Sequence, residues 1–143
     1  MTDSANSRPT VALVHGAFAD SSGWNDVVGQ LQAAGIAVQA ISNPLRGIAA
    51  DAAYVASAIR QIPGPVLAVG HSYGGATISN AAPHADNVIG LVFVAGFAPD
   101  EGETLSDVEG GSTDSVLNSA LLQLQYPAGP GTETMVETPC TQL

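Results

Sequence analysis

Residues 66–75 read VLAVGHSYGG, and this stretch decides how the rest of the sequence is interpreted. Residues 66–69 form a short apolar run, typical of a strand that is buried on both faces, and a helical pattern follows over residues 72–82. Between them, residues 70–74 have the form G-x-S-x-G, which in a turn from strand to helix lifts the serine hydroxyl clear of the sheet. The sequence therefore predicts that Ser72 is a nucleophile on a sharp elbow.

The residues around Ser72 support this interpretation. Gly70 and Gly74 leave room where two backbones approach each other and a Cβ would clash. The first N–H groups of a helix carry the positive end of its dipole, so we expect the N–H of Tyr73 to bind an oxyanion. His71 precedes the nucleophile on a turn where neighbouring side chains diverge, and we expect a structural role for it.

A second loop follows the apolar run TVALV at residues 10–14 and has the sequence His15-Gly16-Ala17-Phe18. An oxyanion hole needs two N–H groups that converge on one oxygen, and one of them comes from a neighbouring strand-end loop. Ala17 is the expected second donor, with Phe18 as the alternative. His15 and Gly16 are expected to shape the loop that carries these N–H groups.

The rest of the chain alternates strands with helices. Further strands are predicted at residues 36–41 and 88–95, so the order is βαβαβαβ. This order predicts an α/β fold with a doubly wound, mostly parallel sheet and helices on both faces. Ligands bind such sheets beyond the carboxyl ends of the strands, where both loops lie. The apolar helix positions are Trp24, Val27, Val28 and Leu31 in the first helix, and Ile48, Val55 and Ile59 in the second.

The first of these helices has signals at both of its ends. Ser21 and Ser22 are the expected N-caps, and Gly35 is the expected C-terminal stop. Trp24 shares its helical spacing with Leu31, so we expect its ring to pack in the core.

Composition and charge exclude several classes of protein. The chain has 143 residues, 45% apolar and 11% charged, as expected for one compact domain or part of one. Its formal net charge of −10 repels phosphate backbones, so nucleic-acid binding is not expected. No apolar run is long enough to span a bilayer and no apolar signal core begins the chain, so a cytoplasmic protein without membrane contact is expected. Cys140 is the single cysteine, so no intrachain disulfide can form.

The motifs of several other families are missing from the sequence. No predicted strand is followed by G-x-G-x-x-G, which argues against a dinucleotide-binding domain. No P-loop, zinc-ligand spacing or heptad repeat is present either.

Three stretches resemble the α/β-hydrolase family in order and spacing: VALVHGAF with SSGW, VLAVGHSYGG, and VIGLVFVAGFAPDEGE. The resemblance covers residues 9–137. Within the family, the sequence is similar to small esterases near the branch of methylesterases and hydroxynitrile lyases. It implies a serine hydrolase that cleaves a small carboxylic ester through an acyl-enzyme at Ser72, with no cofactor and no metal. It leaves open the lyase and perhydrolase reactions hosted on the same core.

The resemblance also implies a division of the chain into segments. We expect a polar tail at residues 1–8, the N-terminal half of the hydrolase core at 9–99, an acidic cap at 100–137 and an atypical tail at 138–143. The expected cap helix carries the apolar residues Val116, Leu117, Ala120, Leu121 and Leu124.

In this family the triad runs in chain order serine, acid, histidine. Asp100 and Glu101 follow the fourth predicted strand, a place where some hydrolases of this family have the triad acid, and they are the candidates for it here. We expect His15 to be structural and His84 to lie on the surface, so no histidine is assigned as the base. The later strands of the family pattern are missing, so we expect a chain truncated after the fourth strand and the start of the cap.

Two consequences follow from this expectation. The esterase therefore has an alternative. The chain can instead be a catalytically crippled fragment or a small-molecule binding protein that lacks the triad histidine, or that borrows a base from another chain. An open apolar sheet edge is also expected, and with it self-association.

Overall fold

The computed structural model describes residues 8–100, 103–120, 124–127 and 134–137. The chain divides into two compact units, Met1–Leu105 and Ser106–Leu143, which we describe separately.

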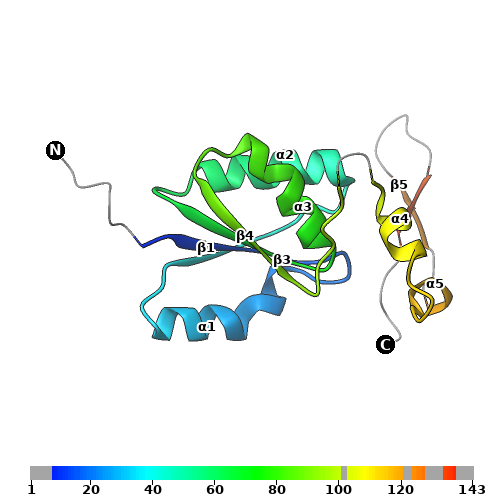
Figure 1. Ribbon diagram of the computed structural model, residues 1–143, viewed down its shortest axis with the longest axis horizontal. Coiled ribbons are helices and arrows are strands. Elements are labelled where there is room, and N and C mark those ends of the chain that lie inside the picture. The colour runs from blue at the N-terminus through cyan, green and yellow to red at the C-terminus, as the bar shows by residue number, and fades with distance from the viewer. Residues whose placement is uncertain (1–7, 101–102, 121–123, 128–133, 138–143) are drawn as a thin grey trace. The chain divides into compact units, whose positions relative to one another are not determined.

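A four-stranded sheet with the order β2-β1-β3-β4 forms the centre of the first unit, and all its neighbouring strands are parallel. One helix, α1, covers one face of this sheet, whereas α2 and α3 cover the other (Figure 1). The predicted fold class, a parallel α/β sheet with helices on both faces, is therefore confirmed. The strands are β1 (Thr10–Val14), β2 (Val38–Ile41), β3 (Val66–His71) and β4 (Val88–Val94); the helices are α1 (Asn25–Ala33), α2 (Ile48–Arg60) and α3 (Tyr73–Ala81), with short 3-10 turns η1 (Ser21–Trp24) and η2 (Ala82–His84).

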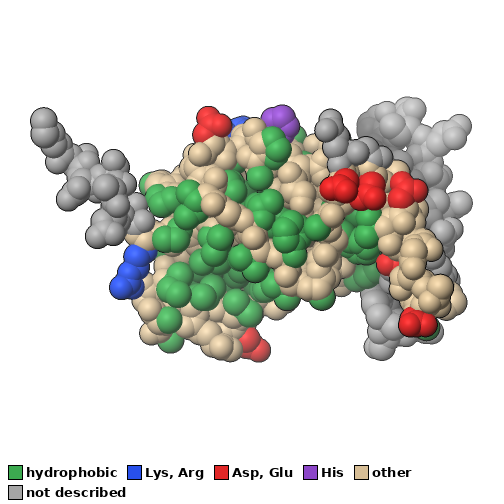
Figure 2. Space-filling model, in the orientation of Figure 1, with side chains coloured by type: hydrophobic (Ala, Val, Ile, Leu, Met, Phe, Trp, Pro, Cys, Tyr) green, Lys and Arg blue, Asp and Glu red, His purple; other side chains and the backbone are tan. Residues whose placement is uncertain are grey.

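Strand β4 lies at one edge of the sheet. Four of its large apolar side chains are exposed, and Ile89 is the most exposed of them at 62%. Figure 2 shows hydrophobic side chains spread over the central part of the face in view. The exposed side chains of β4 are Ile89, Val92, Phe93 and Val94.

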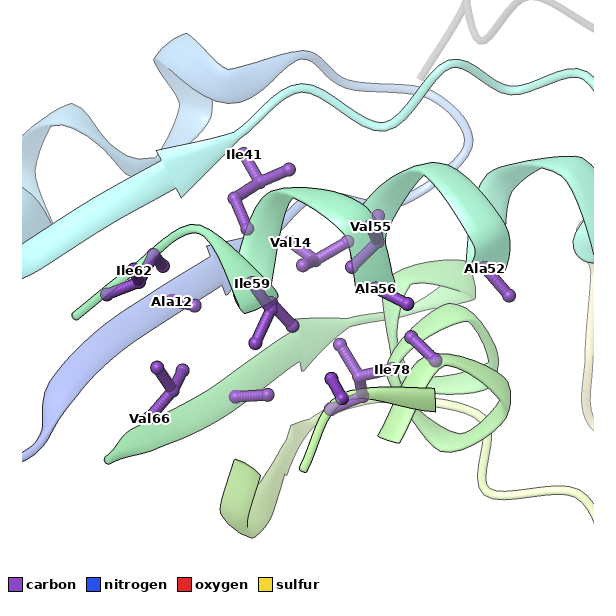
Figure 3. Packing of buried hydrophobic residues seen from close by; sticks show 13 residues of the cluster. Ala12, Val14, Ile41, Ala52, Val55, Ala56, Ile59, Ile62, Val66 and Ile78 are labelled. Atoms are coloured by element: carbon purple, nitrogen blue, oxygen red, sulfur yellow. The ribbon is translucent and has the colours of Figure 1, made fainter. Parts of the chain in front are cut away.

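The core has two layers because side chains of a strand point alternately to opposite faces of the sheet. Ala12 and Val14 of β1 point into the larger layer, which α2 closes with Val55 and Ile59 and which is shown in Figure 3. The residue between them, Leu13, points into the smaller layer on the side of α1. Burial of one such side chain contributes about 1.5–3 kcal/mol to the stability of the folded state.

Helix α1 differs from the prediction at its start and on its apolar face. Ser21 and Ser22 do not cap it, because they lie inside the 3-10 turn η1, whose N-cap is Asp20; the Asp20 carboxylate accepts the N–H of Ser22 at 2.8 Å. Trp24 is buried as expected, but Val27 is 37% exposed and lies outside the core. The first residue predicted on the apolar face of α2, Ile48, is also 37% exposed.

Strand β2 begins two residues later than predicted because of how α1 ends. Gly35 adopts a φ of +71°, and the N–H of Ile36 donates to the carbonyl of Leu31 at 2.9 Å. Ile36 is thereby held in the C-terminal turn of the helix.

The second unit contains α4 and α5 and a separate antiparallel strand pair. Leu124 was predicted in the cap helix, and this is wrong: α5 ends at Ala120 and Leu124 begins a strand. Leu121, Glu101 and Cys140 lie outside the described residues. The elements are α4 (Leu105–Gly110), α5 (Leu117–Ala120), β5 (Leu124–Pro127) and β6 (Thr134–Glu137).

No helix in the described part of the chain combines the length and apolar character required to cross a membrane.

Candidate active site

Ser72 stands alone between two regular elements, because β3 ends at His71 and α3 begins at Tyr73. Its backbone has φ of +52° and ψ of −124°, a conformation that costs a non-glycine residue about 1–3 kcal/mol. Three hydrogen bonds hold it there: its carbonyl accepts the N–H of Gly75 at 2.9 Å and of Phe97 at 3.1 Å, and its own N–H donates to Val94 at 3.3 Å. The surrounding backbone therefore imposes the strained turn that carries the serine.

The glycines of the motif lie where backbones nearly touch. A Cβ on Gly70 would lie 2.4 Å from the carbonyl oxygen of Gly74, and a Cβ on Gly74 would lie 2.4 Å from the carbonyl oxygen of Val14. Neither position can accept a side chain without a shift of the backbone. The tight turn therefore depends on glycine at both positions.

The loop at residues 15–18 lies directly against Ser72, because β1 pairs with β3 in parallel and Val14 is opposite Gly70. A Cβ on Gly16 would lie 3.1 Å from the carbonyl oxygen of His71 and 3.4 Å from the Oγ of Ser72. Ala17 and Phe18, the two expected oxyanion donors of this loop, follow in an exposed turn. The structure thus brings the two sequence motifs together at one end of the sheet.

His15 is 3% exposed, and both of its ring nitrogens are engaged. Its Nε2 accepts the N–H of Asn43 at 2.9 Å, so its proton must be on Nδ1, which lies 2.9 Å from the carbonyl oxygen of Gly16 and donates to it. The ring therefore bridges two loops and has no free nitrogen to accept a proton from Ser72.

The two other histidines are exposed. The ring of His71 meets that of Trp24 edge to face, with 6.4 Å between ring centroids. His84 lies in η2, and its carbonyl oxygen accepts a hydrogen bond from Arg60 at 2.7 Å. Within the described part of the chain, no side chain forms a hydrogen bond with the Oγ of Ser72.

Of the two expected acids the structure describes Asp100, and no hydrogen bond in the described part of the chain joins it to Ser72. Asp100 is exposed, and its N–H donates to the carboxylate of Glu103 at 2.7 Å. Asp100 and Glu103 line an open cavity of about 780 Å³ together with Tyr73 and Ile48. Ser72 is not among the residues that line this cavity.

Sequence reasoning missed Asp51, a fully buried carboxylate next to the elbow. It accepts the N–H of Arg46 at 2.8 Å and the hydroxyl of Tyr73 at 2.7 Å. Burial, and after it this hydrogen bond, raise the pKa of the Tyr73 phenol well above its usual value. A signal was present, because Asp51 precedes Val55 by four residues and so lies on the buried face of α2.

Two further buried polar residues, Asn43 and Thr77, were also missed. The Nδ2 of Asn43 donates to the hydroxyl of Thr77 at 3.1 Å. These residues are far apart in sequence, and no local pattern points from one to the other. Among the described residues, no cluster of three or more His, Cys, Asp or Glu side chains could hold a metal ion.

Comparison with known proteins identifies the family of the chain. The model of the alpha/beta hydrolase family matches residues 11–136. No curated protein matches the sequence. A pyrethroid hydrolase from Sphingobium faniae is 30% identical over 67% of this chain, with a TM-score of 0.59.

Two more solved structures share the fold. An extracellular alpha/beta-hydrolase from a Paenibacillus species is 24% identical over 70% of this chain, with a TM-score of 0.64. Polyneuridine aldehyde esterase is 19% identical over 94% of the chain, with a TM-score of 0.76. The matches cover 43%, 46% and 58% of the pyrethroid hydrolase, the Paenibacillus protein and the esterase respectively, so this chain spans about half the length of its solved relatives.

Proposed function

The chain belongs to the alpha/beta hydrolase family, and on this basis we propose that it is a serine hydrolase that cleaves a small carboxylic ester through an acyl-enzyme on Ser72. The observation that carries the proposal is the strained Ser72 turn between β3 and α3, with Gly16 packed against it. An esterase and a pyrethroid hydrolase among the structural neighbours support the ester as the substrate class.

In the proposed reaction, the Oγ of Ser72 forms a bond with the carbonyl carbon of the ester, and the serine proton passes to a general base. The negative charge that develops on the carbonyl oxygen is bound by the N–H groups of Tyr73 and Ala17, or of Phe18 in place of Ala17. The bond to the alcohol then breaks and the alcohol takes up the proton. Water attacks the acyl-enzyme by the same route and releases the acid.

The general base is the missing part of this scheme. Both nitrogens of His15 are engaged, and neither His71 nor His84 is hydrogen-bonded to the nucleophile in the described part of the chain. This observation favours a second function, in which the chain binds carbonyl compounds, or is acylated on Ser72, without rapid turnover. A base from another chain would restore turnover.

Mixing the purified protein with p-nitrophenyl acetate tests both functions. An enzyme gives steady release of nitrophenol, whereas a chain that is only acylated gives one burst and a mass increase of one acetyl group on Ser72. Ser72→Ala should abolish either signal. Ser79→Ala is the matched control because it removes another α3 hydroxyl, which donates to the carbonyl of Gly75 at 3.0 Å.

Release of nitrophenol that survives in Ser72→Ala would refute the assignment of Ser72 as the nucleophile. A folded wild type that shows neither release nor acetylation would refute the hydrolase and leave binding alone.

Three further expectations from the sequence stay predictions: the cap role of residues 100–137, a cytoplasmic location and self-association through the edge of the sheet.

A further inference from the structure

We propose that a buried chain of hydrogen bonds from His15 through Asn43 and Thr77 to Tyr73 sets the distance between the two halves of the oxyanion hole. Asn43 and Thr77 are then positioning residues for the N–H groups of Ala17 and Tyr73. This inference rests on the oxyanion role that the proposed function gives to those groups.

Asn43 holds the Ala17 half of the oxyanion hole through two contacts with His15, which lies two residues before Ala17. Its N–H donates to the Nε2 of His15 at 2.9 Å, and its Nδ2 lies 3.4 Å from the carbonyl oxygen of the same residue. Asn43 is 5% exposed and His15 is 3% exposed, so water competes little for these contacts. The end of β1 is therefore fixed to the loop that follows β2.

The same Asn43 amide reaches the second half through Thr77, which is fully buried in α3. The Nδ2 of Asn43 donates to Thr77 Oγ1 at 3.1 Å, and Thr77 Oγ1 donates to the carbonyl oxygen of Tyr73 at 3.2 Å. An amide nitrogen has two hydrogens, so one can serve His15 and the other Thr77. The chain of bonds then ends on the residue whose N–H forms the second half of the hole.

Tyr73 is also held from its other end, because its hydroxyl donates to the buried Asp51 of α2 at 2.7 Å. The side chain of Tyr73 is thus fixed to α2, whereas its carbonyl is bonded within α3 to Thr77, which Asn43 holds. Apolar residues of the same volume would fill the space without the cost of burying polar groups. Hydrogen bonds have direction, however, so this network imposes a specific geometry that apolar packing does not, even though the Oδ1 of Asn43 is buried without a hydrogen-bond partner in the described part of the chain. An oxyanion hole needs such geometry, since a shift of about 1 Å in a catalytic group can cost about 100-fold in rate.

Two sets of variants distinguish a role in positioning the N–H groups of the oxyanion hole from a role in the stability of the fold alone. Thr77→Val keeps the shape of the side chain but removes its hydroxyl, and Thr77→Ser restores the hydroxyl. Asn43→Ala breaks the bridge at its centre. Its matched control is Asn87→Ala, because Asn87 Nδ2 also bridges two carbonyls, of Ile59 at 2.9 Å and Ile62 at 3.1 Å, at the start of β4 away from the elbow.

The readouts are the rate at which a fluorophosphonate labels Ser72, the backbone amide NMR shifts of Ala17 and Tyr73, and the unfolding free energy. We expect Thr77→Val and Asn43→Ala to lower the labelling rate about 10- to 100-fold and to move the Ala17 amide signal. Thr77→Ser should recover the rate. Asn87→Ala should lose stability but keep both the rate and the signal.

Equal losses of stability in Asn43→Ala and Asn87→Ala, with an unchanged labelling rate and an unchanged Ala17 signal, would overturn the proposal. If Asn43→Ala does not fold, Thr77→Val against Thr77→Ser gives the same comparison, because these two variants differ in the hydroxyl that links Asn43 to Tyr73. If wild type is not labelled at all, the proposed function fails, and the Ala17 signal in Thr77→Val alone decides whether the bridge positions the loop.

Discussion

The hydroxyl of Tyr73 donates to the carboxylate of Asp51 at 2.7 Å, which ties the first residue of α3 to the first turn of α2 beside Ser72. Asp51 is fully buried, and its other oxygen accepts the N–H of Arg46 at 2.8 Å. The carboxylate therefore has a donor for each oxygen. Ionisation of Tyr73 would place two negative charges at hydrogen-bonding distance, so the phenol is held in its neutral form.

This bond predicts how stability depends on alkaline pH. Unfolded tyrosine loses its proton near pH 10, whereas burial and Asp51 raise the pKa of Tyr73 above that value in the folded protein. The unfolded chain then binds fewer protons than the folded one, so the unfolding free energy should fall as the pH rises above about 10. Absorbance at alkaline pH should show a late phenol step that Tyr73→Phe removes and Tyr54→Phe retains. A late step that survives in Tyr73→Phe would contradict the assignment.

The close packing of Gly16 against Ser72 predicts that one added methyl group strongly lowers the reactivity of Ser72. A Cβ on Gly16 would lie 2.9 Å from the Cβ of Ser72, so Gly16→Ala must push the loop and the elbow apart. We expect Ser72 labelling to slow about 100-fold. Gly29→Ala is the control, because a Cβ there meets no atom within 4 Å and should stabilise α1 by about 0.5–1 kcal/mol. Equal labelling rates in the two variants would show that the loop can move without consequence.

The strained backbone of Ser72 predicts an opposition between stability and function. Its φ of +52° is unfavourable for serine and alanine but open to glycine. Ser72→Gly should therefore be more stable than Ser72→Ala by about 1 kcal/mol after the entropy cost of glycine, while both variants lose acylation. Urea denaturation measures the difference. Equal unfolding free energies would mean that the turn stores no strain.

The sequence predicts the elements of the first unit well because their signals are local. Val66 and its apolar neighbours form a strand buried on both faces, and the glycines at 70 and 74 are required by contacts under 3 Å. The prediction for Leu124 is wrong because short apolar runs fit a helix and a strand equally well. Val27 has the helical spacing of the core, yet it is exposed, and α1 packs against the core with the half-buried Val28 and Leu31.

The polar part of the site could be predicted only in part. Ser72 and Gly16 lie in sequence motifs whose residue types follow from backbone geometry. The partners of Asn43 depend on where the end of β1 and the first turn of α3 meet in space, which no local spacing reveals. Asp51 is intermediate, because its place on the apolar face of α2 marks it as buried but does not identify Tyr73 as its donor.

The open edge of β4 gives the last prediction. Among the described residues β4 pairs with β3 alone, and its sequence VIGLVFV has no charge and no proline. Natural edge strands avoid pairing with other chains through charges, prolines or covers. We expect the protein to self-associate as its concentration rises, and Val92→Lys to suppress this association, measured by size-exclusion chromatography with light scattering.

Val27→Lys is the matched control for this experiment, since Val27 is 37% exposed and Val92 is 38% exposed, but Val27 lies on α1. If the edge is the contact, lysine at position 92 disperses the assembly, because a charge beside a paired strand must be desolvated, and lysine at position 27 leaves the assembly intact. A monomeric wild type at every concentration would refute the prediction. Equal dispersal by both lysines would instead mean that the contact is not specific to the β4 edge.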